Sequence, residues 1–399
     1  MDVEVRRLGP AEGRAVARLS GEAFGVPDGP AGGGDHERDL DQPGFRWWGV
    51  ADGPRLVAQA ADRAYDGWFG GRVLPVAGIA GVTVAAEVRG RGVLGPLLLT
   101  LLEQARERGA VVSTLFPSAP GIYRRTGYET IVTTQEVDVP SSVLTALPAS
   151  PHVTLRRAEE QDAEAVRRVY DAWAAGVDGP LTRRGVSFPA SDAELVGAHT
   201  GVTLAEDADG RVLGYAAWTR GSGRGTGPEL SVSDLVAGRT DAYAALLRAL
   251  GSFSSVASTV RLRTSGHDLA RLLLPATSWA PVVEELYMLK VLDVAAAFTG
   301  GRCAPGLGWQ GTFTLAGDVL PGLDGAYAVV AEGGRLTCGR ASATDDRTLA
   351  PRGLALLVTG ALPCRDLRVL GLLNGGDPAQ DGDWDALVAG RVRGVLDHF

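Results

Sequence analysis

Residues 82–105 read VTVAAEVRGRGVLGPLLLTLLEQA. This pattern predicts a strand, then a tight turn of arginine and glycine, then the first turns of a helix that buries its leucines. Such a turn leaves free backbone N–H groups at the positive end of a helix dipole, and its glycines let a bound group come close. Arg89 and Arg91 add positive charge, so the stretch predicts a cradle for a pyrophosphate. A plain glycine turn with solvated arginines is the alternative at this point.

A second informative segment follows that helix. Residues 110–117 read AVVSTLFP, a continuous apolar run that is typical of a strand inside a sheet. Residues 122–128 read IYRRTGY and begin on a predicted short helix. The turn and this segment together resemble the GCN5-related N-acetyltransferase (GNAT) superfamily, in which an Arg/Gln-x-x-Gly-x-Gly/Ala turn holds acetyl-coenzyme A and a later aromatic-Tyr-x-x-x-Gly-aromatic segment carries a tyrosine. The turn fits except that Leu94 replaces a small residue and Gly95 follows.

An internal repeat predicts two copies of one α/β module. Residues 5–19 and 155–169 align without a gap at an offset of 150, with the identical pairs Arg6/Arg156, Arg7/Arg157, Ala15/Ala165, Val16/Val166 and Arg18/Arg168. Each copy predicts a short strand, a polar turn and an amphipathic helix. Pro140, Pro148 and Pro151 mark a linker, and from about residue 291 alternating strands with glycine turns indicate a third, smaller domain.

The resemblance narrows to the enhanced-intracellular-survival (Eis) branch of the GNAT family, through motifs within residues 71–128. It implies an α/β (α+β) fold of tandem GNAT modules followed by a sterol-carrier-protein-like α+β domain. The implied boundaries are 1–148 for the active GNAT domain, 149–290 for a degenerate one and 291–399 for the C-terminal domain. In the second module, VAGRTDAYAALL lacks the pattern of the turn and carries Asp241 where a phosphate would sit, so we interpret this module as structural.

Composition and charge exclude several function classes. The chain has 399 residues, enough for two or three domains, and its 45% hydrophobic content is too high for disorder. The net charge of −8 argues against nucleic acid as a partner and favours a small cationic molecule or peptide. Widely spaced cysteines and scattered histidines predict no metal site. With neither a signal peptide nor an apolar run of roughly 20 residues, we expect a cytoplasmic protein with no membrane partner.

The Eis resemblance implies the reacting groups. Acetyl transfer needs a deprotonated amine and a protonated leaving thiolate. In Eis-like enzymes the C-terminal carboxylate is the general base, through water, and a tyrosine is the general acid; these roles fall on Phe399 and Tyr123. Acetyl-coenzyme A (acetyl-CoA) is the implied co-substrate, held at its thioester and pantetheine by backbone N–H groups of the strand and at its pyrophosphate by the turn. The expected binding residues are Val82, Thr83, Val84, Arg89, Gly90, Arg91, Gly92, Val93, Leu94, Gly95 and Ser118.

Both reacting residues have structural alternatives. Tyr123 also fits a half-buried core tyrosine with its hydroxyl at the surface. Phe399 also fits a frayed terminus, which is the usual state of a chain end. Against fraying, residues 387–399 read LVAGRVRGVLDHF, which predicts a docked terminal helix. His398 lies beside the expected base, but no motif supports a role for it.

The expected substrate is a polycationic amine. Eis-like enzymes acetylate aminoglycosides at several amines, so the resemblance implies aminoglycoside-like amines, and also a homo-oligomer, a hexamer built as a trimer of dimers. The pocket is expected between the polar loop at 25–44, the first module's strands and the C-terminus, and its candidate lining residues are Phe24, Asp28, Asp35, Glu37, Trp47, Asp397 and His398. Acidic loop residues also fit a merely solvated surface. Two other functions stay open: a protein or peptide lysine N-acetyltransferase, and a non-catalytic acyl-CoA or lipid-binding protein.

Overall fold

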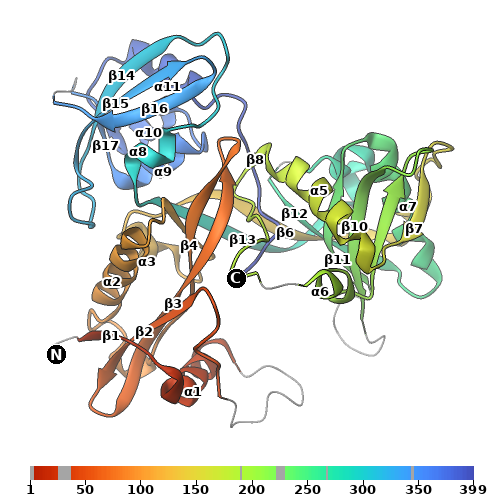
Figure 1. The fold of residues 1–399 in the computed structure, drawn as a ribbon, viewed down its shortest axis with the longest axis horizontal. Helices are drawn as coiled ribbons and strands as arrows, with labels where there is room; N and C mark the ends of the chain where they lie inside the picture. The colour runs from red at the N-terminus through yellow and green to blue at the C-terminus, as the bar shows by residue number, and fades with distance from the viewer. Residues whose placement is uncertain (1–3, 26–36, 189–190, 222–229, 267, 343–345) are drawn as a thin grey trace.

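One continuous sheet joins the first two modules. The computed structural model describes residues 4–25, 37–188, 191–221, 230–266, 268–342 and 346–399. Within them a twelve-stranded sheet has the order β1-β2-β3-β4-β5-β13-β6-β12-β11-β10-β9-β7, and separate sheets have five and two strands. Figure 1 shows the first module in red to orange, the second in yellow to green, and the C-terminal part in blue.

The first module contains the predicted strand–turn–helix. Its strands are β1 (Val5–Arg7), β2 (Phe45–Asp52), β3 (Arg55–Phe69), β4 (Arg72–Val84), β5 (Val112–Leu115) and β6 (Glu129–Pro140). Its helices are α1 (Gly13–Phe24), α2 (Leu94–Glu107), α3 (Pro120–Arg124) and α4 (Ser141–Thr145). Helix α2 buries Leu97, Leu98, Leu101 and Leu102, which follow the spacing of one helical face. The order predicted from the sequence around the Arg/Gly turn is confirmed.

The internal repeat is confirmed at the level of secondary structure. Helix α5 (Ala163–Ala174) starts and ends 150 residues after α1, and the short 3-10 turns before the two helices, Pro10–Glu12 and Glu160–Asp162, keep the same offset. Strand β7 (Thr154–Arg157) precedes α5 as β1 precedes α1. The two modules therefore begin with the same local design.

The modules exchange strands at their junction. The second module's other elements are β8 (Val177–Asp178), α6 (Asp192–Gly197), β9 (Gly201–Glu206), β10 (Val212–Arg220), β11 (Leu230–Ala237), α7 (Thr240–Gly251), β12 (Thr259–Ser265) and β13 (Ala280–Val291). Strand β6 pairs with β12, and β13 returns to lie between β5 and β6 of the first module. The sheet of the first module is therefore completed by a strand of the second module. The boundaries at 148/149 and 290/291 stay predictions.

The C-terminal part is a small α+β unit. Its strands are β14 (Trp309–Leu315), β15 (Gly325–Glu332), β16 (Arg335–Arg340), β17 (Thr348–Leu349) and β18 (Leu373–Asn374). Its helices are α8 (Val294–Phe298), α9 (Pro351–Val358), α10 (Cys364–Val369) and α11 (Asp381–Ala386), and α9 packs on β6 and β13. Its likeness to sterol carrier proteins stays a prediction. Among the helices of the described residues, none is long and apolar enough to cross a membrane.

The predicted terminal helix over 387–399 is wrong. Helix α11 ends at Ala386, and the chain then forms the short strand β19 (Val392–Arg393), which is parallel to β8, and continues to Phe399 without regular secondary structure. Gly390 has φ +76°, a backbone conformation that interrupts a helix, and Gly394 lies tightly against Val177. The expected docking is nevertheless present, because Val395 is fully buried and Leu396 is 8% exposed.

Candidate active site

Strands β4 and β5 diverge at the centre of the first module. They pair in parallel at residues 76–78 and 112–114, and beyond Gly78 the two strands separate. On its other edge, β4 has a bulge, because the pairing with β3 shifts from Ala61–Ala80 to Gln59–Thr83. A bulge leaves a residue outside the regular ladder and bends the strand. Backbone groups of β4 are thereby left at the opening between the two strands, where the sequence placed Val82, Thr83 and Val84.

The bulge explains the position of Trp47. Gly81 has φ +59°, and a Cβ on it would come within 3.0 Å of the Trp47 ring. Trp47 is 2% exposed, and the guanidinium of Arg38 lies 5.2 Å from its ring centre. The side chain expected to contact substrate is therefore a core residue that supports the bulge of β4.

The Arg/Gly turn has the geometry of an anion cradle. Gly90 and Gly92 have φ of +76° and +81°, and no atom lies within 4 Å of a Cβ built on either. Helix α2 follows with Val93 at its N-cap, and no side chain caps it. Arg89 Nε donates to Val84 O at 3.1 Å, which fixes the turn to the end of β4. An uncapped helix N-terminus beside exposed glycines leaves backbone N–H groups available to an anion such as a pyrophosphate.

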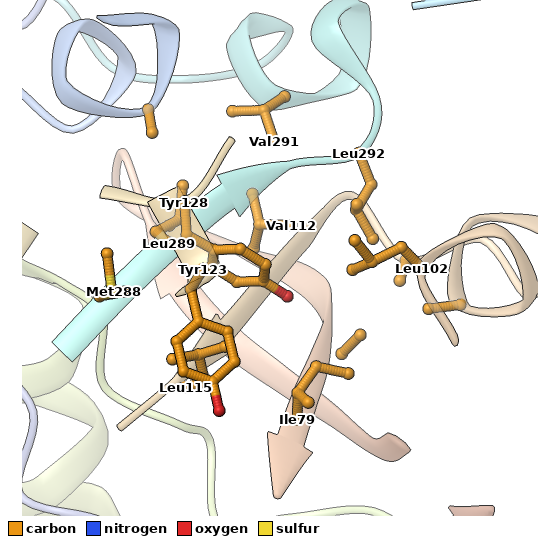
Figure 2. Close-up of a cluster of buried hydrophobic side chains, with 14 of the residues drawn as sticks. Ile79, Leu102, Val112, Leu115, Tyr123, Tyr128, Met288, Leu289, Val291 and Leu292 are labelled. Carbon is orange, nitrogen blue, oxygen red and sulfur yellow. The ribbon is translucent and has the colours of Figure 1, made fainter. Parts of the chain in front are cut away.

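Tyr123 is buried with a free hydroxyl. It lies on α3 and is 6% exposed, and its ring meets that of Tyr128 edge-on at 6.1 Å. Figure 2 shows both tyrosines in one buried cluster with Leu115 and Ile79, their hydroxyls pointing in different directions. Burial raises the pKa of Tyr123 to about 12. Within the described residues its hydroxyl has no hydrogen-bond partner, and it is not one of the buried unpartnered polar atoms, so the ring is buried while the hydroxyl reaches the surface.

The C-terminus reaches the point where β4 and β5 separate. The ring of Phe399 lies 5.0 Å from Tyr65, 5.5 Å from Phe116 and 6.5 Å from Tyr287. A Cβ on Gly78 would come within 2.8 Å of the Phe399 ring, so the last residue packs against β4 at its final residue paired with β5. Figure 1 shows the C-terminus between the first module and the second. The terminus is packed and not frayed.

The two residues before Phe399 are held by different partners. His398 stacks on Phe116, with ring centres 4.5 Å apart, and its Nε2 lies 3.4 Å from Glu285 Oε1. The carboxylate of Asp397 is buried and accepts hydrogen bonds from Arg183 Nε at 2.7 Å and from Tyr170 Oη at 3.0 Å. Asp397 is thus a paired structural carboxylate, whereas His398 stays half exposed beside the terminus.

The other candidate residues lie in different settings. Phe24 is 61% exposed at the end of α1, and the exposed Glu37 lies 3.8 Å from Arg14. Ser118 is exposed just ahead of α3. Asp28 and Asp35 lie outside the described residues. The structure therefore places Phe399 against β4 at Gly78 and Tyr123 in the buried cluster with Leu115 and Ile79, and it does not gather Phe24 and Glu37 there through any described contact.

Sequence reasoning missed the residues that hold the terminus. Tyr65, Phe116 and Tyr287 come from β3, the end of β5 and β13, and Arg183 comes from a loop of the second module. None belongs to a spaced motif, so no local signal in the sequence marks them. Their proximity arises because β13 crosses into the first module and because the chain end returns to it.

The second module shows no equivalent cradle in its described residues. Helix α7 starts at Thr240, and the carboxylate of Asp241 accepts from the backbone N–H of Ala242 and from Arg239 Nε, both at 3.0 Å. A carboxylate of the chain itself therefore occupies the helix N-terminus, where an anion would bind.

The comparisons with known proteins agree with this architecture. Two models described as acetyltransferase (GNAT) domain match residues 4–131 and 166–291. An uncharacterized N-acetyltransferase of Streptomyces avermitilis is 28% identical over 81% of both chains, and N-acetyltransferase Eis of Mycobacterium tuberculosis is 29% identical over 72% of both. The crystal structure of a GCN5-related N-acetyltransferase from Kribbella flavida superposes with a TM-score of 0.83 at 28% identity, covering 100% of this chain and 98% of that one.

Fold and site together define an acetyl-CoA-dependent N-acetyltransferase with two tandem GNAT modules. Membership of this class favours catalysis over the non-catalytic acyl-CoA or lipid binding that the sequence alone left open. The chain belongs to the GNAT acetyltransferases, whose two domain models together match more than half of it, and it is similar to Eis-like members of that family.

Proposed function

We propose that this enzyme transfers acetyl directly from acetyl-CoA to a primary amine of aminoglycoside-like polyamines, with Tyr123 as general acid and the C-terminal carboxylate of Phe399 as general base. The carrying observation is that both residues approach the end of β5. Tyr123 shares a buried cluster with Leu115 (Figure 2), and Phe399 packs on Phe116, the next residue. The proposal therefore puts acid and base at the same end of β5, where β4 and β5 separate.

The binding part of the proposal follows the first module's backbone. The N–H groups of Arg89 and Arg91 already donate to Ala86 O and Val88 O, so the pyrophosphate is held by the backbone N–H groups of Gly90 and of residues 92–95 at the start of α2, with the exposed Arg89 and Arg91 side chains beside them. The backbone of β4 at 82–84 pairs with the pantetheine arm and donates to the thioester oxygen, where negative charge develops during transfer. The bulge of β4 supports this role, because it leaves backbone groups outside the ladder.

The chemical part assigns each proton. The Phe399 carboxylate accepts, through water, the proton of the substrate ammonium, and the neutral nitrogen attacks the thioester carbonyl carbon. A C–N bond forms, the attacking nitrogen becomes positively charged and releases its second proton to solvent, and the C–S bond breaks. Tyr123 donates its hydroxyl proton to the departing sulfur and regains one from solvent. A pKa of about 12 keeps the Tyr123 hydroxyl protonated at neutral pH, as an acid of this kind requires.

The substrate class rests on charge and on the Eis-like family. A net charge of −8 attracts polycations over distance. Lysine side chains of proteins or peptides are the alternative acceptors. A homo-oligomer, a hexamer of the trimer-of-dimers type, is part of the proposal on the same family ground, and light scattering of the purified protein tests it.

The test is thiol release from acetyl-CoA with a panel of aminoglycosides and a lysine peptide. One alanine added after Phe399 moves the carboxylate and is expected to lower turnover by about 10²-fold or more. A Phe399→Leu variant keeps the carboxylate in place and is expected to retain measurable transfer. Unchanged turnover after the added alanine would overturn the base assignment. Turnover with the lysine peptide but with no aminoglycoside would overturn the substrate class and leave the chemistry standing.

A further inference from the structure

The second module has a strand divergence of its own. Strands β11 and β12 pair in parallel at residues 230–232 and 260–262, and β11 then continues along β10 while β12 continues along β6. This is the arrangement that β4 and β5 have in the first module, where pairing also covers three residues before the strands separate. In the first module the opening is the proposed acetyl-CoA site. The corresponding opening in the second module is filled by the chain itself.

The filling segment is residues 395–397. The backbone N–H of Val395 donates to Ser265 Oγ at 2.9 Å, and Arg263 Nη1 donates to Leu396 O at 3.3 Å. Both partners lie on β12 just beyond its last residue paired with β11. The side chain of Leu396 belongs to the second module's own hydrophobic cluster, together with Val236 of β11. The C-terminal segment is therefore anchored to the diverging strands by backbone and side chain alike.

Arg183 links this segment to β11. Its Nε donates to Asp397 Oδ1 at 2.7 Å, and its two Nη atoms donate to the two carboxylate oxygens of Asp234, a residue of β11. The hydroxyls of Tyr170 and Tyr215 each donate at 3.0 Å, the first to Asp397 and the second to Asp234. Tyr170 Oη also lies 2.9 Å from Leu181 O, so the cluster is tied to the backbone just ahead of Arg183 as well as to the two carboxylates.

The cluster is buried and its backbone is unusual. Asp234 is 5% exposed and Asp397 is 9% exposed, and the guanidinium of Arg183 lies 4.1 Å from the ring centre of Tyr170. Among the described residues, Arg183 is the sole non-glycine residue in the left-handed region, with φ +54°. Surrounding structure must hold such a backbone in place. The backbone conformation at Arg183 is therefore held in the one form that directs its guanidinium at Asp234 and Asp397.

We infer that the second module is the anchor of the catalytic terminus: its strand divergence holds residues 395–397, and Arg183, through Asp397, positions the carboxylate of Phe399. The inference rests on the proposed role of that carboxylate. Two residues of extended chain span about 7 Å, so fixing Asp397 confines the terminal carboxylate to that radius. Arg183 is a positioning residue and does not touch the substrates. Because residues 395–397 occupy the opening between β11 and β12, the second module has no room for acetyl-CoA there, and each chain has one acetyl-CoA site.

The direct test is release of Phe399 by a carboxypeptidase, followed by mass spectrometry, in the wild-type chain and in Arg183→Gln. The variant is expected to lose Phe399 faster under native conditions. Arg347→Gln is the matched control, because Arg347 is also buried, donates to Asp381 at 2.9 Å and lies 5.2 Å from a tryptophan ring, but belongs to the C-terminal unit. Equal release rates in wild type and Arg183→Gln would overturn the anchor.

The kinetic test separates positioning from general stability. Arg183→Gln is expected to lower kcat by about a hundredfold, as displacement of a reacting group by 1 Å does, with an unchanged KM for acetyl-CoA. Arg183→Lys is expected to restore part of kcat, and Arg347→Gln to keep the wild-type kcat whatever its melting temperature. A wild-type kcat in Arg183→Gln overturns the inference. If Arg183→Gln does not fold, Asp397→Asn keeps the shape of the side chain and carries the same expectations and the same overturning results.

Two controls separate this inference from the proposed function. If an alanine added after Phe399 leaves turnover unchanged, the base assignment fails, while the carboxypeptidase rates still decide whether Arg183 anchors the terminus. Calorimetric titration with coenzyme A is expected to give one site per chain. Two sites per chain would overturn the filling of the second divergence.

Discussion

Tyr123 and Tyr128 lie in one short motif with their ring centres 6.1 Å apart, yet their hydroxyls have opposite surroundings. Ser113 Oγ donates to Ala77 O at 2.9 Å, so the Tyr128 hydroxyl is the donor in its 2.5 Å contact with Ser113 Oγ. Within the described residues, the Tyr123 hydroxyl has no such partner. The hydroxyl of Tyr128 is used in a structural hydrogen bond, whereas the hydroxyl of Tyr123 is available for the proposed proton transfer.

The pair predicts opposite effects of the same substitution. Tyr123→Phe removes a hydroxyl without a partner, so the melting temperature is expected to stay unchanged while kcat falls by about 10²-fold or more. Tyr128→Phe leaves a buried Ser113 acceptor unpaired and is expected to cost about 1–3 kcal/mol of stability, with kcat retained. Thermal unfolding and initial rates measure both. A Tyr128→Phe variant as inactive as Tyr123→Phe would contradict the division of roles.

The raised pKa of Tyr123 predicts the alkaline side of the pH profile. Burial shifts that pKa from 10 to about 12, so the general acid keeps its proton throughout the range from pH 7 to pH 10. In that range kcat/KM is expected to rise as the substrate amine deprotonates, and then to level off without a descending limb. The free energy of unfolding is expected to fall as the pH rises from 10, the unfolded pKa of tyrosine, to about 12, the folded pKa of Tyr123, which lies above the assay range. A descending limb below pH 10 that is absent from the residual activity of Tyr123→Phe would refute the assignment.

The sequence predicted the features that depend on local pattern. The 150-residue repeat appears as matching helices α1 and α5, and the Arg/Gly turn lies between β4 and α2 as its pattern indicated. Local propensity and turn chemistry act over a few residues, so they can be read from spacing alone. The same holds for Tyr123, whose motif fixes it on a short helix after a buried strand.

Long-range pairing decided the remaining features. The terminal segment 387–399 has helix-like apolar spacing, but Gly390 turns the chain and Val392 pairs with Val177, more than two hundred residues earlier. The insertion of β13 between β5 and β6 likewise joins segments with no common sequence signal. Arg183 acquires its partners through these same non-local contacts, which is why the cluster around Asp397 could not be predicted.

The turn predicts a matched pair of glycine substitutions. Gly92 in the Arg/Gly turn and Gly53 in the turn between β2 and β3 both have positive φ and open space around a Cβ. Alanine at either position is expected to cost about 1–2 kcal/mol of stability through backbone strain. Gly92→Ala alone is expected to raise the KM for acetyl-CoA, by roughly tenfold or about 1.4 kcal/mol, because its methyl group enters the anion cradle. Equal KM values in the two variants would argue against a pyrophosphate at this turn.

The Arg183 cluster predicts how stability depends on pH. Burial alone would raise the pKa of Asp234, but the charge of Arg183 outweighs it and holds that pKa below its usual range. A carboxyl group of this kind stabilises the fold above its unfolded pKa, about 3.9, and the stabilisation is lost as the pH falls through the folded pKa. The wild-type melting temperature is therefore expected to fall at pH below about 4.

Arg183→Gln is expected to reverse that dependence. Without the cation, burial of Asp234 dominates and its folded pKa rises, so the variant is penalised as pH increases from about 4 toward that raised value. The melting-temperature difference between wild type and variant should accordingly widen between pH 4 and pH 7. The Arg261→Gln control breaks a 2.7 Å pair with the partly exposed Asp138 and should show a far smaller widening. A difference for Arg183→Gln that stays constant across this range would mean that Asp234 is not held ionised by Arg183, and that the cluster stabilises the fold by packing alone.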